Sequence, residues 1–215
     1  MNQDTLKNNS IECWEIVEDL KAGMITLKPG QRLVELHLCK RFGVKRSKVR
    51  EALRQLEQDG FVKIIPHVGA IVAELSQKDI EHTYDLLGVL EGLAARAATP
   101  SITAQHLENI DVLIKKMEAA DKSSMFFDYN KEFHSFLTSL SENDRLIRLA
   151  ENLRNHVRCF YFRGFYRPHI KAASNEHQKI VEAIKDMKPV KVEQLIRNHY
   201  LNSKNRFIKY MNKSL

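Results

Sequence analysis

The chain has 215 residues, of which 43% are hydrophobic and 28% are charged, and it carries a formal net charge of +7. This length suits two domains of ordinary size, and no apolar run approaches the roughly 20 residues that span a membrane. Cys13, Cys39 and Cys159 form no Cys-x-x-Cys pair, and their odd number argues against a disulfide scaffold or a thiolate zinc site. The polar start of the chain leads to no apolar signal core, so a cytoplasmic protein is expected. The positive charge suits a polyanionic partner.

Turn signals separate residues 1–75 from the rest of the chain. Apolar residues at helical spacing predict a helix over 11–21, and two shorter helices follow, one over 34–42 and one from an N-cap at Ser47 to the Asp-Gly turn at 59–60. Two β-rich runs then flank a Pro-His-Val-Gly turn, as in a hairpin. Three helices and a hairpin are typical of a winged helix-turn-helix, which is the fold expected for the first domain.

Residues 76–215 carry helical patterns throughout. Ser76 can cap the first helix together with Asp79, three residues later. The expected helices cover about 77–98, 103–120, 125–140, 144–162, 174–187 and 190–212. Breaks that contain proline or short polar clusters separate them. A mainly α protein is therefore expected, with an antiparallel all-helical bundle as its second domain.

A concentrated positive charge lies where the second and third helices of the first domain meet. Six of the eleven residues from 40 to 50 are lysine or arginine. In a helix-turn-helix, the first residues of the recognition helix enter the major groove, where arginine pairs bidentately with guanine and lysine neutralises phosphate. We therefore expect DNA contacts from the start of this helix and from the tip of the wing, namely Lys45, Arg46, Ser47, Lys48, Arg50, His67 and Gly69. A basic face exposed only to solvent is the alternative.

Four stretches of the first domain follow a family pattern in order: 27–33 (LKPGQRL), 42–44 (FGV), 46–53 (RSKVREAL) and 56–62 (LEQDGFV). Over about residues 11–75 the chain resembles the GntR family of winged-helix regulators. The resemblance implies a transcription regulator that binds double-stranded operator DNA. Two departures bear on the operator sequence: Lys48 stands where proline or threonine is common, and Val68 stands where an arginine often precedes the wing glycine.

Three histidines of the second domain lie on apolar helix faces. His134 shares one face with Asn130, four residues earlier, and His177 and His199 follow apolar stripes of the last two helices. The break at 188–189 lies about 10 to 11 residues from each of these two, or roughly 15 Å along either helix, so an antiparallel hairpin brings them level. With the helix of His134 alongside, three imidazoles and the Asn130 amide oxygen can bind a divalent ion such as zinc, nickel or manganese. Separate core histidines with satisfied hydrogen bonds are the alternative.

The spacing Asn130-x-x-x-His134, the Glu176-His177 pair and the later His199 form a second family pattern. They resemble the FCD ligand-sensing domain of the FadR-like branch of the GntR family, over about residues 77–210. The resemblance implies a helical bundle with a metal held by one Asp or Asn and three histidines. In this chain those positions are Asn130, His134, His177 and His199.

Many relatives of this branch also carry an arginine in the first helix of the sensing domain, near a Leu-Glu step, where this chain has Leu87. One anchor for an effector carboxylate is therefore missing. Arg154 and Arg158 are the expected replacements for effector binding, because arginine binds carboxylates bidentately. Ion pairs on the helix surface are the alternative for both residues.

These expectations combine into a homodimeric regulator, expected to be a repressor, whose two recognition helices read two half-sites. Residues 76–215 would dimerise, bind the metal and a small organic acid, and so control release from DNA. A metal-dependent hydrolase is one alternative, but the core stripes offer no well-placed glutamate or aspartate as a general base. A ligand-independent architectural DNA-binding protein is the other, and it would not need the three histidines for DNA release.

Overall fold

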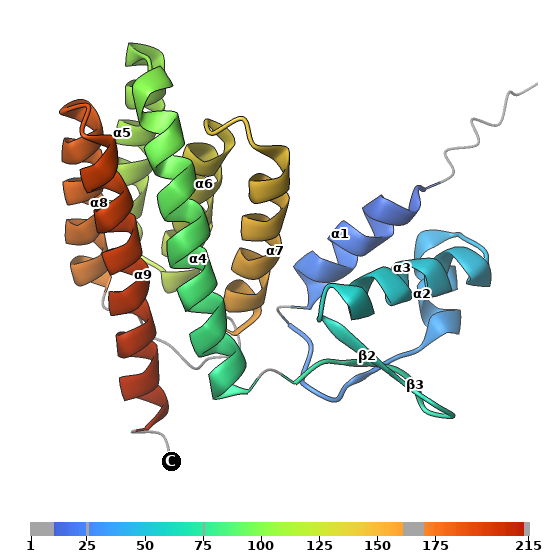
Figure 1. Cartoon of the computed structure of the whole chain (residues 1–215). Coiled ribbons are helices and arrows are strands. Elements are labelled where there is room, and N and C mark those ends of the chain that lie inside the picture. Colours follow the sequence, from blue (N-terminus) through green and yellow to red (C-terminus); the bar gives the residue numbers. More distant parts are fainter. Residues whose placement is uncertain (1–10, 25, 75, 161–169, 213–215) are drawn as a thin grey trace, which may run out of the picture. The chain divides into compact units, whose positions relative to one another are not determined.

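The structure is a computed structural model that describes residues 11–24, 26–74, 76–160 and 170–212. Within these ranges most residues are helical, and the strands belong to one small sheet (Figure 1). The chain divides into two compact units, Met1–Glu74 and Leu75–Leu215. The expected fold class is confirmed, with a winged helix-turn-helix followed by a helical bundle. None of the helices in the described ranges has the length and apolar character that a membrane span needs.

Helices and short strands alternate in the first unit. They are α1 (Cys13–Gly23), β1 (Arg32–Leu33), α2 (Glu35–Phe42), α3 (Arg46–Gln58), β2 (Val62–Ile65) and β3 (Gly69–Val72). The sheet has the order β1-β3-β2 and is antiparallel, with Leu33 opposite Ala70 and Val62 opposite Val72. The expected hairpin is present as β2 and β3. The two-residue β1 is too short to produce a strand pattern in the sequence.

Helix α3 begins earlier than the sequence predicts. Its N-cap is Lys45, whose backbone is extended, and Ser47 lies inside the first turn, so the expected N-cap at Ser47 is wrong. The preceding turn depends on Gly43, which ends α2 with a φ of 65°. This left-handed conformation suits glycine because glycine has no Cβ. The apolar face of α3 is buried through Val49, Ala52, Leu53 and Leu56. Arg46, Arg50 and Arg54 are thereby left toward solvent.

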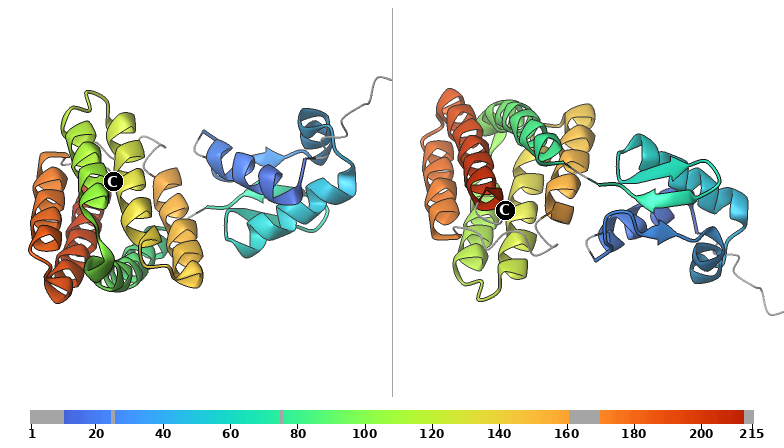
Figure 2. Two further views of the ribbon diagram at one scale, coloured as in Figure 1. Left: turned by 90° about the horizontal axis from the view of Figure 1, so that it is seen from above. Right: turned by 90° about the horizontal axis from the view of Figure 1, so that it is seen from below.

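The helices of the second unit run side by side as a bundle (Figures 1 and 2). They are α4 (Gln77–Ala98), the short 3-10 helix η1 (Thr99–Ser101), α5 (Ala104–Glu118), α6 (Ser123–Ser139), α7 (Asp144–Phe160), α8 (Ile170–Lys185) and α9 (Pro189–Met211). Helix α8 begins earlier than expected, and the expected end of the fourth long helix at 162 lies outside the described residues. Fully buried side chains from several helices fill the core, among them Phe133, Ile180, Ile184, Val192 and Ile196.

Helices α4 and α9 approach closely because glycines face the contact. A Cβ on Gly88 would lie 3.4 Å from the Cβ of Tyr200, and a Cβ on Gly92 would lie 3.2 Å from the Cγ of Arg197. Larger side chains at these positions would force the two helices apart, since protein interiors are close-packed. The approach lets Tyr200 reach the interior, where its hydroxyl oxygen lies 3.4 Å from Nδ1 of His134.

The start of α4 generates a stability prediction. The Ser76 Oγ accepts a hydrogen bond from the Asp79 backbone N–H at 3.1 Å, and the Asp79 carboxylate accepts one from the Ser76 N–H at 2.9 Å. We expect Ser76→Ala to cost about 1 kcal/mol of stability and to lower the melting temperature by about 2–4 °C, measured by circular dichroism. Ser124→Ala, at an exposed position in the first turn of α6, is the matched control and should leave the melting temperature unchanged.

The same cap gives a pH dependence. Hydrogen bonds from Ser76 lower the pKa of Asp79 below its ordinary value of 3.8. The stabilisation is therefore fully present above that value and is lost as the pH falls through the lower pKa of the folded state. The difference between Ser76→Ala and the native chain should shrink in acid, and a difference that stays constant would contradict this assignment.

Candidate functional sites: a basic recognition helix and a buried histidine cluster

Two of the predicted DNA-contacting arginines share one carboxylate. Arg46 Nε contacts the Glu35 carboxylate, and Arg50 Nε lies 3.0 and 3.1 Å from its two oxygens. Glu35 is the first residue of α2, and the arginines lie one turn apart on α3. The hydrogen bond from Arg46 is the main cause that lowers the pKa of Glu35, which therefore stays charged at neutral pH. The arginine side chains are 69% and 55% exposed, so a duplex can reach them.

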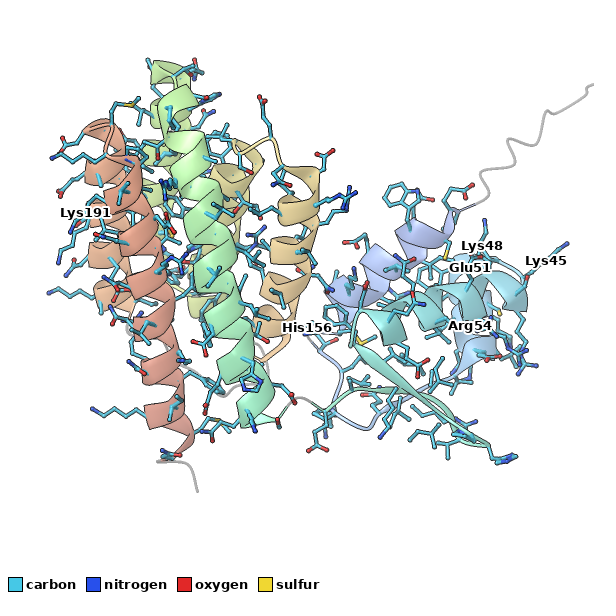
Figure 3. The ribbon with its side chains drawn as sticks, viewed as in Figure 1. Lys45, Lys48, Glu51, Arg54, His156 and Lys191 are labelled. Atoms are coloured by element: carbon cyan, nitrogen blue, oxygen red, sulfur yellow. The ribbon has the colours of Figure 1, made fainter. Side chains whose placement is uncertain are left out.

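Lys48 lies on a different side of α3 from this arginine pair. Its Nζ donates a hydrogen bond to the Ile11 carbonyl oxygen at 2.8 Å and lies 3.8 Å from the Glu12 carboxylate. Figure 3 shows Lys48 beside Glu51 on the helix. The structure therefore brings the two arginines together and places Lys48 near the start of α1.

The other predicted DNA contacts belong to the same unit. Lys45 and Ser47 are exposed at the start of α3. His67 lies in the turn between β2 and β3, Gly69 is the first residue of β3, and both have a positive φ. The sequence-based expectation did not include Arg54, which is exposed one turn after the arginine pair (Figure 3). Its spacing of four residues was the signal that could have found it.

Three histidines from three helices converge inside the second unit. His134 of α6, His177 of α8 and His199 of α9 each offer one ring nitrogen within 4.8 Å of the others. The Nε2 atoms of His134 and His177 lie 3.3 Å apart, and all three side chains are buried. Asn130 lies one turn before His134 on α6 and is half-buried. We call the three imidazoles the histidine cluster.

Two carboxylates flank the histidine cluster. Oε2 of Glu91 lies 2.7 Å from Nδ1 of His134, and Oε2 of Glu176 lies 2.8 Å from Nδ1 of His199. A carboxylate that accepts a hydrogen bond from Nδ1–H leaves the Nε2 lone pair for a metal, as is usual for metal-bound histidines. The sequence analysis did not identify Glu91 of α4 as a core carboxylate beside the histidines, although its side chain is 2% exposed.

Each of these carboxylates is paired with one arginine. Arg154 of α7 contacts Glu91, and Arg206 of α9 binds Glu176 through Nη1 and Nη2 at 2.7 and 3.1 Å. Burial acts to raise the pKa of Glu91, but the charges of its histidine and arginine partners outweigh burial and lower it. Burial acts in the same way on Glu176, and hydrogen bonds from its histidine and arginine partners lower its pKa to about 2. Both carboxylates therefore carry a negative charge, and the neighbouring arginine compensates the charge of each one.

Arg154, one of the two predicted effector contacts, is a core residue and not a surface ion pair. Its side chain is 7% exposed. Besides Glu91, its Nη1 lies 3.3 Å from the Thr138 hydroxyl oxygen, and its Nε has no hydrogen-bond partner among the described residues. The side chain of Arg158, the other predicted contact, lies outside the described residues. Arg154 thus belongs to the same buried network as His134.

The electrostatics of the histidine cluster fit a bound cation. Burial lowers the pKa of His177 well below its ordinary value, and burial is also the main cause that lowers the pKa of His199. Both rings are therefore neutral at neutral pH, which is the form in which imidazole binds a metal. Nδ1 of His177 has no hydrogen-bond partner among the described residues. A buried polar atom without a partner is rare and indicates an additional group, such as a water, beside Nδ1. The ion itself would bind Nε2, which faces Nε2 of His134.

The buried pair of Glu91 and Arg154 generates a second stability prediction. Glu91→Gln leaves the Arg154 charge buried without its partner, so we expect a loss of about 3–5 kcal/mol, measured by urea denaturation. Replacing both residues by leucine should recover much of this loss, because no unpaired charge then remains. Asp111→Asn is the control, since its ion pair with Lys185 at 2.9 Å is exposed and should contribute at most about 1 kcal/mol. An equally small effect at Glu91 would contradict the assignment.

The chain matches two family models. The model described as "Bacterial regulatory proteins, gntR family" matches residues 14–72, and the model described as "FCD domain" matches residues 82–202. The first match runs from α1 through the wing, and the second contains the whole histidine cluster. The resemblances to both families that the sequence suggested are confirmed.

Similar proteins are described as transcription regulators. The chain is 30% identical to YdhC of Bacillus subtilis, an uncharacterized HTH-type transcriptional regulator, over 81% of this chain and 80% of that protein. It is 26% identical to the probable D-xylose utilization operon transcriptional repressor of Paenarthrobacter nicotinovorans, over 86% and 81%. The solved structure of E. coli McbR/YncC shares the fold, with a TM-score of 0.79 at 20% identity over 92% of this chain and 97% of that one.

Proposed function

Because the chain belongs to the GntR family of bacterial regulatory proteins and carries an FCD domain, we propose that it is a cytoplasmic repressor controlled by a divalent metal and a small organic acid. The broader class is plain from the family: the chain is a DNA-binding transcription regulator with a ligand-binding domain, not an enzyme. The observation that carries the proposal is the buried histidine cluster with its two carboxylate partners.

The proposed metal ligands are the imidazoles of His134, His177 and His199, joined by the side-chain oxygen of Asn130. Zinc, nickel and manganese suit such a set. A bound ion would supply positions for the anionic oxygen of an effector. Glu91 and Glu176 would act from behind the rings, fixing their orientation through Nδ1.

An organic acid is the effector class that this environment favours. The proposed metal ligands, three imidazoles and one amide, bring no negative charge, and the two neighbouring carboxylates are already paired with arginines. A divalent ion would therefore keep its positive charge and attract an anion. Arg154 supports the same choice, because its Nε has no hydrogen-bond partner in the part of the chain that the structure describes. Arg158 is retained as a second effector contact from its place on α7.

The proposed DNA contacts all lie in the first unit, on α3 and at the wing. Arg46 and Arg50 would read guanines in the major groove, because both guanidinium groups are exposed at the start of α3. Lys45, Ser47 and Lys48 would contact phosphates. The wing residues His67 and Gly69 would approach the backbone or minor groove.

A second copy of the chain is the proposed partner of the helical unit. Leu86, Val89 and Leu93 of α4 are 52%, 46% and 49% exposed and are spaced three and four residues apart, so they form one apolar face. We call them the α4 stripe. A self-complementary face of this kind suits a two-fold dimer, and a dimer presents two recognition helices to two half-sites.

Metal content tests the sensing half of the proposal. We expect about one divalent ion per native chain by mass spectrometry and none in His134→Ala/His177→Ala, because three neutral imidazoles are needed to hold the ion. His82→Ala, at an exposed histidine of α4, is the matched control and should keep the ion. Glu176→Gln should weaken metal binding by about 10–100-fold, since it removes the carboxylate behind His199.

DNA release distinguishes the regulator from an architectural protein. A duplex enriched from a randomised pool would be mixed with the native chain, zinc and a panel of di- and tricarboxylates, and binding followed by fluorescence anisotropy. The proposal expects at least one acid to release the duplex from the native chain and not from the histidine variant. Absence of metal after reconstitution, or equal release from both, would overturn the sensing proposal.

The dimer gives a separate prediction. Leu93→Glu places a charge on the α4 stripe, so we expect the mass in light scattering to fall from two chains to one and binding to the enriched duplex to weaken. Val112→Glu, at an exposed valine of α5, is the matched control and should remain dimeric. A native mass of one chain that persists with the duplex present would contradict the dimer.

A further inference from the structure

One glutamate connects the two helices of the DNA-reading motif. Glu35 opens α2, and its carboxylate accepts hydrogen bonds from the Nε atoms of both Arg46 and Arg50 on α3. The arginine side chains stay more than half exposed, whereas the Glu35 side chain is 24% exposed. The carboxylate therefore lies at the base of the arginine pair, and the pair extends from it toward solvent.

We propose that Glu35 is a positioning residue that sets the DNA specificity of this regulator. Nε lies on one side of the planar guanidinium group, and the edge formed by Nη1 and Nη2 lies at its far end. A carboxylate that binds through Nε fixes the plane and leaves that far edge for the bidentate pair with guanine. The inference rests on the proposed base-reading role of Arg46 and Arg50 and adds the residue that orients them.

The charge of Glu35 has a second effect on binding. Sequence-independent affinity comes from cations that neutralise phosphates. A carboxylate within hydrogen-bonding distance of two of those cations offsets part of their charge and repels the phosphate backbone. Glu35 therefore weakens binding to any duplex while it favours the guanine contacts of the correct one. Both effects raise the ratio of specific to nonspecific affinity.

A contribution to folding alone does not account for this arrangement. Ion pairs between exposed side chains add little to stability because solvent screens them and ordering costs entropy. One carboxylate shared by two exposed arginines also leaves the cations with half the counter-charge that they would need for full pairing. The arrangement suits orientation of the arginines better than stabilisation of the unit.

The experiment compares the full chain with Glu35→Gln, Glu35→Asp and Glu51→Gln. Glu51→Gln is the control, because it also removes one negative charge but does so from the side of α3 that carries Lys48 (Figure 3). There the Glu51 charge adds to burial in raising the pKa of the Cys13 thiol. The probes are a random-sequence duplex pool and the duplex enriched from that pool by the native chain. Anisotropy at several salt concentrations gives both affinities, and melting curves show that each variant is folded.

The inference expects Glu35→Gln to bind the random pool more tightly and the enriched duplex about tenfold more weakly. The salt dependence on the random pool should steepen by up to about 0.9 for each arginine that turns to phosphate. Glu35→Asp, which keeps the charge on a shorter side chain, should recover part of the lost specificity ratio. Glu51→Gln should keep the native ratio.

Arg46→Ala/Arg50→Ala separates failure of this inference from failure of the proposed function. If the arginine variant loses preference for the enriched duplex while Glu35→Gln keeps the native ratio, the positioning role of Glu35 is overturned and base reading by the arginines stands. If the arginine variant keeps the preference, the proposed base-reading role falls, and the role of Glu35 falls with it.

Discussion

The arrangement of the helical unit depends on the buried carboxylate of Glu91, which is stable only when charged or hydrogen-bonding partners surround it. Glu91 is almost fully enclosed, and an isolated charge in such a place costs several kcal/mol. His134 Nδ1 and the Arg154 guanidinium group satisfy it from two other helices. Because these partners come from α6 and α7, the charge of one residue on α4 ties three helices to a common geometry. The orientation of His134 in the histidine cluster follows from that pairing.

Helical periodicity predicted the histidine cluster but not its partners. His134, His177 and His199 lie on apolar stripes, and the similar distances of His177 and His199 from the break at 188–189 place these two side by side in an antiparallel hairpin. Local spacing was therefore enough to predict that the three imidazoles meet. Glu91 continues the buried stripe of Tyr84 and Leu87, and that spacing was a usable signal. A charged residue on such a stripe is stable only if distant residues neutralise it, and Arg154 and Glu176 meet their partners through packing that no local pattern encodes.

The DNA-reading unit shows the same division between local and distant information. The density of cations around Arg46 and Arg50 predicted the recognition helix, because charge placement is visible in the sequence. The N-cap was misplaced at Ser47, since the turn at Gly43 lets α3 begin at Arg46 without a side-chain cap. The link from Glu35 to both arginines spans two helices and therefore appears only in the folded chain.

Helix α4 connects the proposed sensing site to the proposed dimer. Its inner face carries Glu91, a second face carries Gly88 and Gly92 against α9, and its outer face carries the α4 stripe. An α-helix packed this closely moves as a rigid element. In the proposed mechanism, an acid draws Arg154 or His134 away from Glu91 and so removes a contact that fixes the inner face of α4. Because α4 is rigid, its outer face would shift together with the inner one. A small displacement at the histidine cluster would then alter how two copies of α4 meet, and with it the spacing of two recognition helices.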